Sequence, residues 1–149
     1  MEAQELGFIG DEATDLAALI ERVLAPYANH PEAVTITPDG PVILGSSALT
    51  SLGLVLHELA TNAAKYGALS VAGGRVLLDW RLGEGGKLLL AWREEGGPPV
   101  HPPVRRGFGT RLIERGLAHD LDGEVKLDFA PAGVRCALHI PFSHRLRLD

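Results

Sequence analysis

The sequence is poor in cysteine, because Cys136 is the only one among its 149 residues. A single cysteine excludes an internal disulfide framework and is typical of proteins from a reducing compartment. Cys136 lies in a stretch of alternating apolar residues. We therefore expect a buried structural thiol at this position and not a nucleophile.

The sequence also lacks a long hydrophobic run. No apolar stretch approaches the ~20 residues of a membrane-spanning helix, and the acidic N-terminus lacks the basic start of a signal peptide. We therefore expect a cytoplasmic location without direct insertion into a membrane.

Positive charge is scarce as well. The 14 lysines and arginines are outnumbered by 19 acidic residues, which leaves a formal net charge of −5 at pH 7. Because generic nucleic-acid binding needs a net basic face, this balance argues against nucleic acid as a partner. Four arginines nonetheless lie close together in the segment 105–115.

The remaining composition is that of one globular domain. The hydrophobic fraction is 46% and the charged fraction 22%, values typical of a folded domain, and a chain of this length can bury a single core. The sequence contains no internal repeat. We therefore expect one domain over residues 1–149, with residues 1–10 as a loose lead-in.

Hydrophobic periodicity predicts the order of the elements. Apolar residues at helical spacing predict a first helix from residue 16, with Thr14 or Asp15 as its N-cap. Ser46 or Ser47 is expected to be the N-cap of a second, longer helix that ends near residue 66. Alternating apolar residues predict strands at 33–37, 42–44, 75–82, 87–93, 124–129 and 134–141.

These elements and a third helix expected over residues 108–119 indicate an α+β fold. We expect a two-layer α/β sandwich in which a mixed, mostly antiparallel sheet of about five strands carries three helices on one face. Strands and helices do not alternate regularly, which argues against a Rossmann-type fold.

The segment 56–67 carries the first candidate site. Glu58, Asn62 and Lys65 are spaced i, i+4 and i+7, so their side chains fall within roughly 60° of one another on a helix. A carboxylate can orient a water, an amide oxygen can reach a metal, and an ammonium can neutralise phosphate. The set therefore suits a divalent metal bound to a phosphorylated ligand, although polar residues at this spacing also occur on an ordinary solvated helix face.

Two further segments could complete such a site. Gly107 and Gly109 stand at the expected start of the third helix, where unpaired backbone N–H groups and the helix dipole favour phosphate; a plain turn is the alternative. Glu94 ends an expected strand, where its carboxylate can accept a hydrogen bond from an exocyclic amine such as that of adenine. Gly96 then leaves room for a flat ring, and the alternative for Glu94 is a solvated acid.

Three motifs together resemble a known family. They are Leu-His-Glu-Leu-Ala-Thr-Asn at 56–62, Trp-Arg-Glu at 92–94 and Gly-Phe-Gly-Thr-Arg-Leu-Ile-Glu at 107–114. This combination resembles the ATP-binding catalytic domain of sensor histidine kinases, which has the Bergerat-type fold of the histidine kinase, gyrase and MutL ATPases. It is most similar to the HWE group, named for a His in the first motif, here His57, and for the Trp-x-Glu. The similarity covers about residues 15–141.

The resemblance implies ATP and Mg²⁺ as cofactors and assigns roles to individual residues. Asn62 would coordinate Mg²⁺ and Lys65 would meet phosphate. Glu58 would orient or deprotonate the attacking group, or hold a metal-bound water. Glu94 stands where related kinases have an Asp that reads the adenine amine. The remaining ATP-binding residues would be Tyr66, Gly96, Arg106, Gly107, Phe108, Gly109 and Thr110. His57 is assigned no chemical role, and we expect it either to be structural or to support a neighbouring residue of the site.

The resemblance also implies partners. The catalytic domain would pass the ATP γ-phosphoryl group to a histidine on a separate dimerisation domain, and indirectly serve a response regulator. We find no acceptor hairpin in these 149 residues and expect ATP·Mg²⁺ binding without autophosphorylation of the chain alone. The alternatives are a standalone serine kinase of the anti-sigma-factor type, which shares this fold, and a degenerate docking module.

Overall fold

A computed structural model describes residues 14–83, 86–100, 121–142 and 146–148. Its main sheet has five strands in the order β3-β5-β6-β8-β7. β3 pairs with β5 in parallel, and the other three pairings are antiparallel. The strands are β3 (Val34–Thr37), β5 (Arg75–Gly83), β6 (Lys87–Glu95), β7 (Glu124–Ala130) and β8 (Gly133–Pro141).

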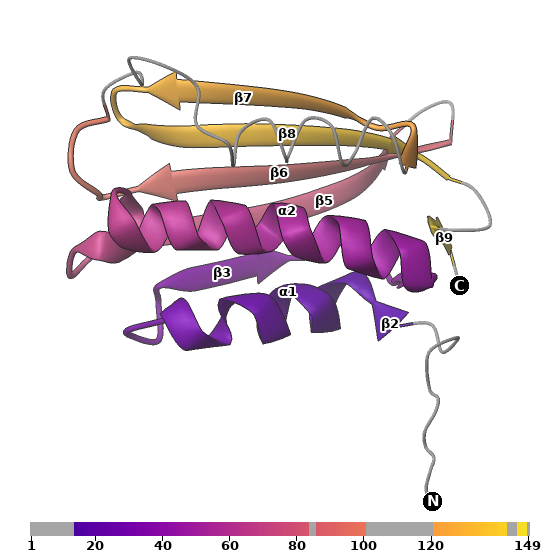
Figure 1. Ribbon diagram of the computed structural model, residues 1–149, viewed down its shortest axis with the longest axis horizontal. Helices are drawn as coiled ribbons and strands as arrows, with labels where there is room; N and C mark the ends of the chain where they lie inside the picture. The colour runs from indigo at the N-terminus through magenta and orange to yellow at the C-terminus, as the bar shows by residue number, and fades with distance from the viewer. Residues whose placement is uncertain (1–13, 84–85, 101–120, 143–145, 149) are drawn as a thin grey trace, which may run out of the picture.

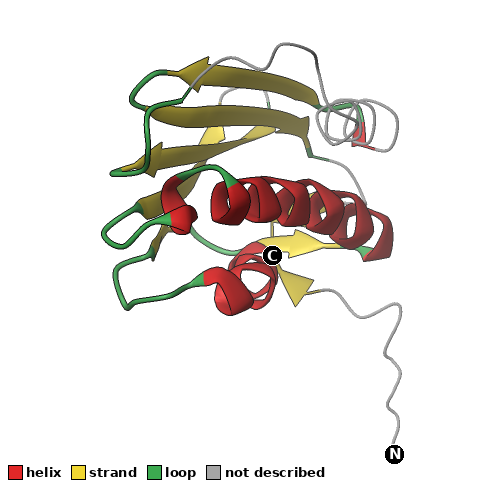
Figure 2. Cartoon of the chain, turned by 60° about the vertical axis from the view of Figure 1, so that its left-hand side comes forward, coloured by secondary structure: helices red, strands yellow, loops and turns green. Residues whose placement is uncertain are grey.

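Among the described residues, two α-helices cover one face of this sheet. α1 (Leu16–Leu24) and α2 (Ser46–Lys65) lie alongside each other, with α2 across the middle of the sheet (Figures 1 and 2). A short 3-10 helix follows each of them, namely η1 (Ala25–Tyr27) and η2 (Ala68–Ser70). The expected two-layer α+β architecture with a mixed, mostly antiparallel sheet is therefore confirmed.

The ends of the helices differ in how they are capped. The Asp15 side chain accepts a 2.7 Å hydrogen bond from the Ala18 amide and caps α1, as one of the two expected candidates. The N-cap of α2 is Gly45, which has no side chain to accept such a bond. The expectation of a serine cap was wrong, because Ser46 already belongs to the helix.

A second, smaller sheet was not expected from the sequence. It consists of β2 (Thr14–Asp15), β4 (Val42–Leu44) and β9 (Leu146–Leu148), all antiparallel. The predicted strand at 42–44 therefore exists, but it pairs outside the main sheet. β2 and β9 have only two and three residues, which is too short for a periodic pattern. The third expected helix, 108–119, lies outside the described residues.

The core lies between the helices and the inward face of the sheet. Successive side chains of a strand point to opposite faces, and the inward rows are fully or almost fully buried. They are Val76, Leu78 and Trp80 on β5, Leu88, Leu90 and Trp92 on β6, and Cys136, Leu138 and Ile140 on β8. From the helices, Leu16 and Ile20 of α1 and Leu52 and Leu56 of α2 complete this core. Cys136 is thus a buried thiol, as expected, and burial raises its pKa to about 12.

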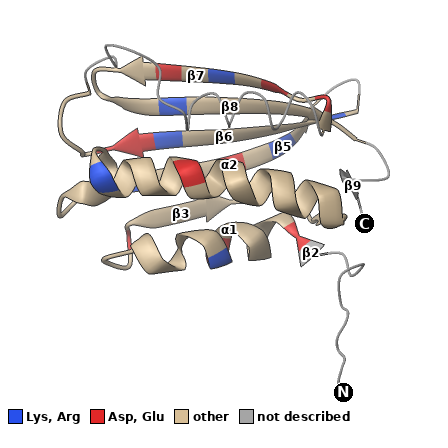
Figure 3. Cartoon of the chain, in the orientation of Figure 1, with Lys and Arg blue, Asp and Glu red and all other residues tan. Residues whose placement is uncertain are grey.

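Charge is distributed unevenly over this scaffold (Figure 3). Charged residues occur along β5, β6, β7 and β8, whereas α2 carries just two, Glu58 and Lys65. Both fall in the second half of this 20-residue helix. The charged part of α2 therefore lies toward its C-terminal end, next to η2.

Candidate functional site

α2 presents the predicted polar residues on the side away from the core. Leu52, Leu56 and Leu59 are at most 3% exposed and anchor the helix. Glu58 is half-buried, while Asn62 and Lys65 are exposed. Within the described part of the chain, none of these three side chains forms a hydrogen bond or an ion pair. Their oxygen and nitrogen atoms are therefore available to a ligand.

The end of α2 lies close to the start of η2. The amide of Tyr66 donates to the Asn62 carbonyl at 2.8 Å, and that of Gly67 donates to Ala63 at 3.0 Å. The Tyr66 side chain is 74% exposed. The aromatic ring therefore extends from the same end of the helix as Lys65, which precedes it directly.

Glu94 is a buried carboxylate at the end of β6. It is 5% exposed, and both of its oxygens accept hydrogen bonds. The Ala68 amide donates to Oε1 at 3.0 Å, and the Trp92 indole N–H donates to Oε2 at 2.9 Å. Burial raises the pKa of Glu94 above its ordinary value, and these two hydrogen bonds oppose part of the rise. The alternative of a solvated strand-end acid is thereby excluded.

Glycines allow the backbone to approach Glu94 and Ala68 closely. A Cβ on Gly97 would lie 2.7 Å from the Ala68 Cα, and a Cβ on Gly67 would collide with Glu94 Oε1. Substitution of Gly74 would collide with the Ala68 carbonyl oxygen. We refer to Gly67, Gly74 and Gly97 as the glycine cradle. It holds the first residue of η2 against the end of β6.

Gly96 was predicted to make room for a flat ring. Its φ of +73° favours glycine by itself, and a Cβ at this position would lie 2.9 Å from the Gly73 carbonyl oxygen. The backbone conformation and the approach of Gly73 therefore already require a glycine here. Space for a ligand remains a prediction at Gly96.

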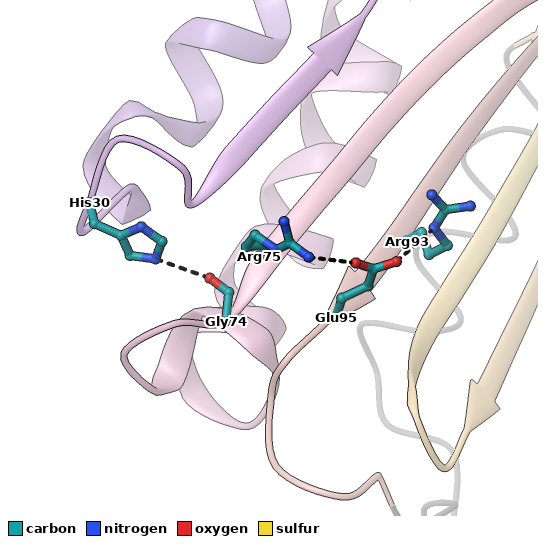
Figure 4. A network of polar contacts seen from close by, with 5 residues as sticks. All are labelled: His30, Gly74, Arg75, Arg93 and Glu95. Carbon is teal, nitrogen blue, oxygen red and sulfur yellow. Dashed lines mark hydrogen bonds and ion pairs between the residues drawn. The ribbon is translucent and has the colours of Figure 1, made fainter.

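Polar contacts fix the strand ends around the glycine cradle (Figure 4). A ring nitrogen of His30 lies 3.1 Å from the Gly74 carbonyl oxygen. On the neighbouring strand ends, Arg75 pairs with Glu95 at 3.0 Å, and Arg93 reaches the other oxygen of Glu95 at 3.5 Å. These ion pairs are roughly half-exposed, so each stabilises the fold by at most about 1 kcal/mol. The Arg75–Glu95 pair joins β5 to β6, whereas Arg93 and Glu95 both belong to β6, beside Glu94.

His57 lies apart from these polar residues. Its ring is exposed and forms an edge contact with Tyr27 of η1, with 6.3 Å between the ring centroids. The contact joins α2 to the end of α1. This position fits the structural role expected for His57.

Five predicted residues lie outside the described part of the chain: Arg106, Gly107, Phe108, Gly109 and Thr110. The sequence interpretation also missed two contacts. It did not foresee the bond of Trp92 to Glu94, although residues i and i+2 share a strand face and this spacing could have indicated it. It missed Ala68 entirely, because no sequence signal joins a backbone amide to a carboxylate 26 residues away.

The donor set can be tested against the chemistry of Mg²⁺. No cluster of three or more His, Cys, Asp or Glu residues that could hold a metal occurs within the described ranges. Mg²⁺ in nucleotide sites needs only one or two protein oxygens, because phosphates and waters supply the rest. The Asn62 amide and the half-buried Glu58 carboxylate, one helical turn apart, fit that requirement.

The fold is that of histidine kinase catalytic domains. The histidine kinase domain of a blue-light-activated histidine kinase from Erythrobacter litoralis superimposes with a TM-score of 0.72 at 20% identity, over 93% of this chain and 71% of that one. The mycobacterial sensor histidine kinase MprB superimposes with a TM-score of 0.65 at 20% identity, over 88% of this chain and 97% of that one.

Sequence comparison gives a more particular relationship. The chain is 46% identical over 135 residues to blue-light-activated histidine kinase 1 of Erythrobacter litoralis, which covers 87% of this chain. It spans 36% of the length of that relative. No protein-family model matches the chain. None of the helices in the described ranges has the length and apolar character needed to cross a membrane. The identity over 135 residues makes the chain a homologue of one part of this Erythrobacter litoralis histidine kinase.

Proposed function

We propose that this chain is the ATP-binding catalytic domain of a sensor histidine kinase of the HWE group. It transfers the γ-phosphoryl group of ATP to a histidine on a separate dimerisation domain. The observation that carries this proposal is the 46% identity over 135 residues to a protein named as a histidine kinase. The polar side chains of α2, which have no partner among the described residues, and the buried Glu94 carboxylate support it. The former can bind phosphate and Mg²⁺, and the latter can accept a hydrogen bond from adenine.

The phosphate end of the nucleotide lies along α2 in this proposal. Lys65 neutralises phosphate, the Asn62 amide oxygen would hold Mg²⁺, and Glu58 orients or deprotonates the attacking group. Mg²⁺ held there would supply positive charge to offset the charge of the phosphates. Phosphoryl transfer depends chiefly on positioning and charge neutralisation. The rigid anchoring of α2 in the core therefore matters as much as the identity of its polar residues.

The base end of the nucleotide lies at the end of β6. Glu94 accepts a hydrogen bond from the adenine amine, with Gly96 beside it, and Tyr66 lines the cleft. From the sequence motif we assign backbone contacts with phosphate to Gly107, Phe108, Gly109 and Thr110, and a charge contact to Arg106. The partners are the histidine-bearing dimerisation domain and, indirectly, a response regulator, in the cytoplasm.

Calorimetric titration with ATP, with and without Mg²⁺, tests the proposal. We expect the parent chain to bind ATP more tightly in the presence of Mg²⁺ and Asn62→Ala to lose most of this difference, because it loses the proposed ligand oxygen. Thr50→Ala is the matched control, since Thr50 is an exposed polar residue of α2 that bonds within its own helix. Unchanged Mg²⁺ dependence in Asn62→Ala would contradict the metal assignment.

A further inference from the structure

The carboxylate of Glu94 is held from two separate elements. Trp92 precedes it by two residues on the same face of β6, and its indole N–H lies 2.9 Å from Oε2. Ala68, the first residue of η2, donates its amide to Oε1 at 3.0 Å. The indole is 2% exposed and the carboxylate 5%. One donor on each oxygen fixes the carboxylate plane in a single orientation.

The two donors stabilise the ionised carboxylate against burial, which has the larger effect on the pKa of Glu94 and raises it. Burial disfavours the charged carboxylate, while N–H donors stabilise it. An ionised carboxylate can accept about four hydrogen bonds and donate none, and described residues provide two. It can therefore accept from the exocyclic amine of a base. A neutral carboxylic acid, in contrast, also carries an O–H donor and would discriminate less between an amine and a carbonyl.

We infer that Trp92 is a positioning residue for nucleobase selection. Its indole N–H keeps the Glu94 carboxylate oriented as an acceptor for the amine of adenine. The inference rests on the proposed function, in which Glu94 reads the adenine amine. It gives a reason for a tryptophan two residues before the glutamate: a phenylalanine could fill the same part of the core but has no N–H.

Trp92→Phe tests this role, with ATP and purine riboside 5′-triphosphate as probes. The second nucleotide lacks the 6-amino group and keeps the rest of ATP. We expect Trp92→Phe to weaken ATP·Mg²⁺ binding about tenfold, as loss of a hydrogen bond to a charged group does, and to leave binding of the purine analogue unchanged. Affinities are measured calorimetrically on the full chain.

Trp80→Phe is the matched control. Trp80 is also 2% exposed, and its indole N–H donates to the Gly40 carbonyl at 3.2 Å. This variant likewise loses a buried indole hydrogen bond, but it leaves Glu94 and both of its donors intact. We expect it to bind both nucleotides as the parent does.

The outcomes separate the inference from the proposed function. If Trp92→Phe weakened the binding of both nucleotides equally, or of neither, the inference alone would be overturned. The same would follow if Trp80→Phe also lost affinity for ATP and kept its affinity for the purine analogue. Failure of the parent chain to bind ATP would overturn the proposed function and the inference together. Should Trp92→Phe not fold, the benzothienyl analogue of tryptophan incorporated at this position removes the N–H at nearly constant volume. The affinities of that protein for ATP and for the purine analogue then test the inference in the same way.

Discussion

Glu94 is an ionisable residue in a buried position, and its ionisation therefore couples the stability of the fold to pH. Because its pKa is raised in the folded protein, folding favours the protonated form. The resulting stabilisation is fully present below the ordinary value of 4.5 and is lost as the pH rises through the folded-state pKa. Glu94 therefore makes the fold less stable toward neutral pH.

Glu94→Gln removes this titration. We expect the free energy of unfolding of the parent, relative to that of the variant, to fall as the pH is raised from about 4.5, since glutamine does not ionise. Urea denaturation of both proteins over this range gives the difference directly. Glu124→Gln, at an exposed position of β7, serves as the control. A difference that does not change with pH would contradict the prediction.

The glycine cradle makes a second prediction at the residue scale. Gly97→Ala would place a Cβ 2.7 Å from the backbone of Ala68, which cannot yield as a flexible side chain can. We expect this overpacking to lower the free energy of unfolding by about 1–3 kcal/mol, measured by urea denaturation.

Gly53→Ala is the opposite case and the control for Gly97→Ala. Gly53 lies inside α2, and a Cβ there would meet the Leu19 Cδ1 at 3.8 Å, an ordinary contact. We expect a gain of about 0.5–1 kcal/mol, because alanine favours the helix over glycine. If Gly97→Ala were as stable as the parent, the cradle would not be tightly packed.

At the scale of elements, long periodic segments could be predicted from the sequence and short ones could not. α2 was predicted because its leucines repeat at helical spacing. β5 and β6 were predicted as strands because apolar residues alternate along both of them. β2 and β9 become strands only through pairing with β4, and a tertiary contact of that kind leaves no local pattern.

One part of the candidate site could likewise be predicted from local spacing, and the other part depends on tertiary contacts. Glu58, Asn62 and Lys65 belong to one helix, so their spacing alone placed them on one side of it. The surroundings of Glu94 depend on the close approach of η2 to β6, which no local pattern encodes. The resemblance to histidine kinase catalytic domains is confirmed by the relative and by the fold, whereas the HWE assignment and the roles of the site residues stay predictions.

At the scale of the whole molecule, the sheet separates one histidine from the proposed phosphate site. His139 lies on β8 between the inward-facing Leu138 and Ile140, so its side chain points to the face opposite α2. His30 contacts Gly74, and His57 contacts Tyr27. None of these three described histidines is in the place that in-line transfer to an acceptor near Glu58 and Lys65 requires.

Because the acceptor histidine is proposed to lie on a separate dimerisation domain, we expect the isolated 149-residue chain to bind ATP without phosphorylating itself. Incubation with γ-labelled ATP and Mg²⁺, followed by assay for acid-labile phosphate, measures this. Full-length blue-light-activated histidine kinase 1 of Erythrobacter litoralis is the positive control. Acid-labile label on the isolated chain would contradict the expectation, and alkali-labile phosphoserine on an added partner would instead favour the anti-sigma-factor type of kinase.

The buried thiol in the central part of β8 has a practical consequence. Cys136 is 2% exposed, and its pKa of about 12 leaves almost no thiolate at neutral pH. Since the thiolate is the species that reacts, a disulfide reagent modifies this cysteine chiefly in molecules whose sheet has opened. The sequence has no second cysteine, so the rate at which the thiol is modified reports how often this domain opens.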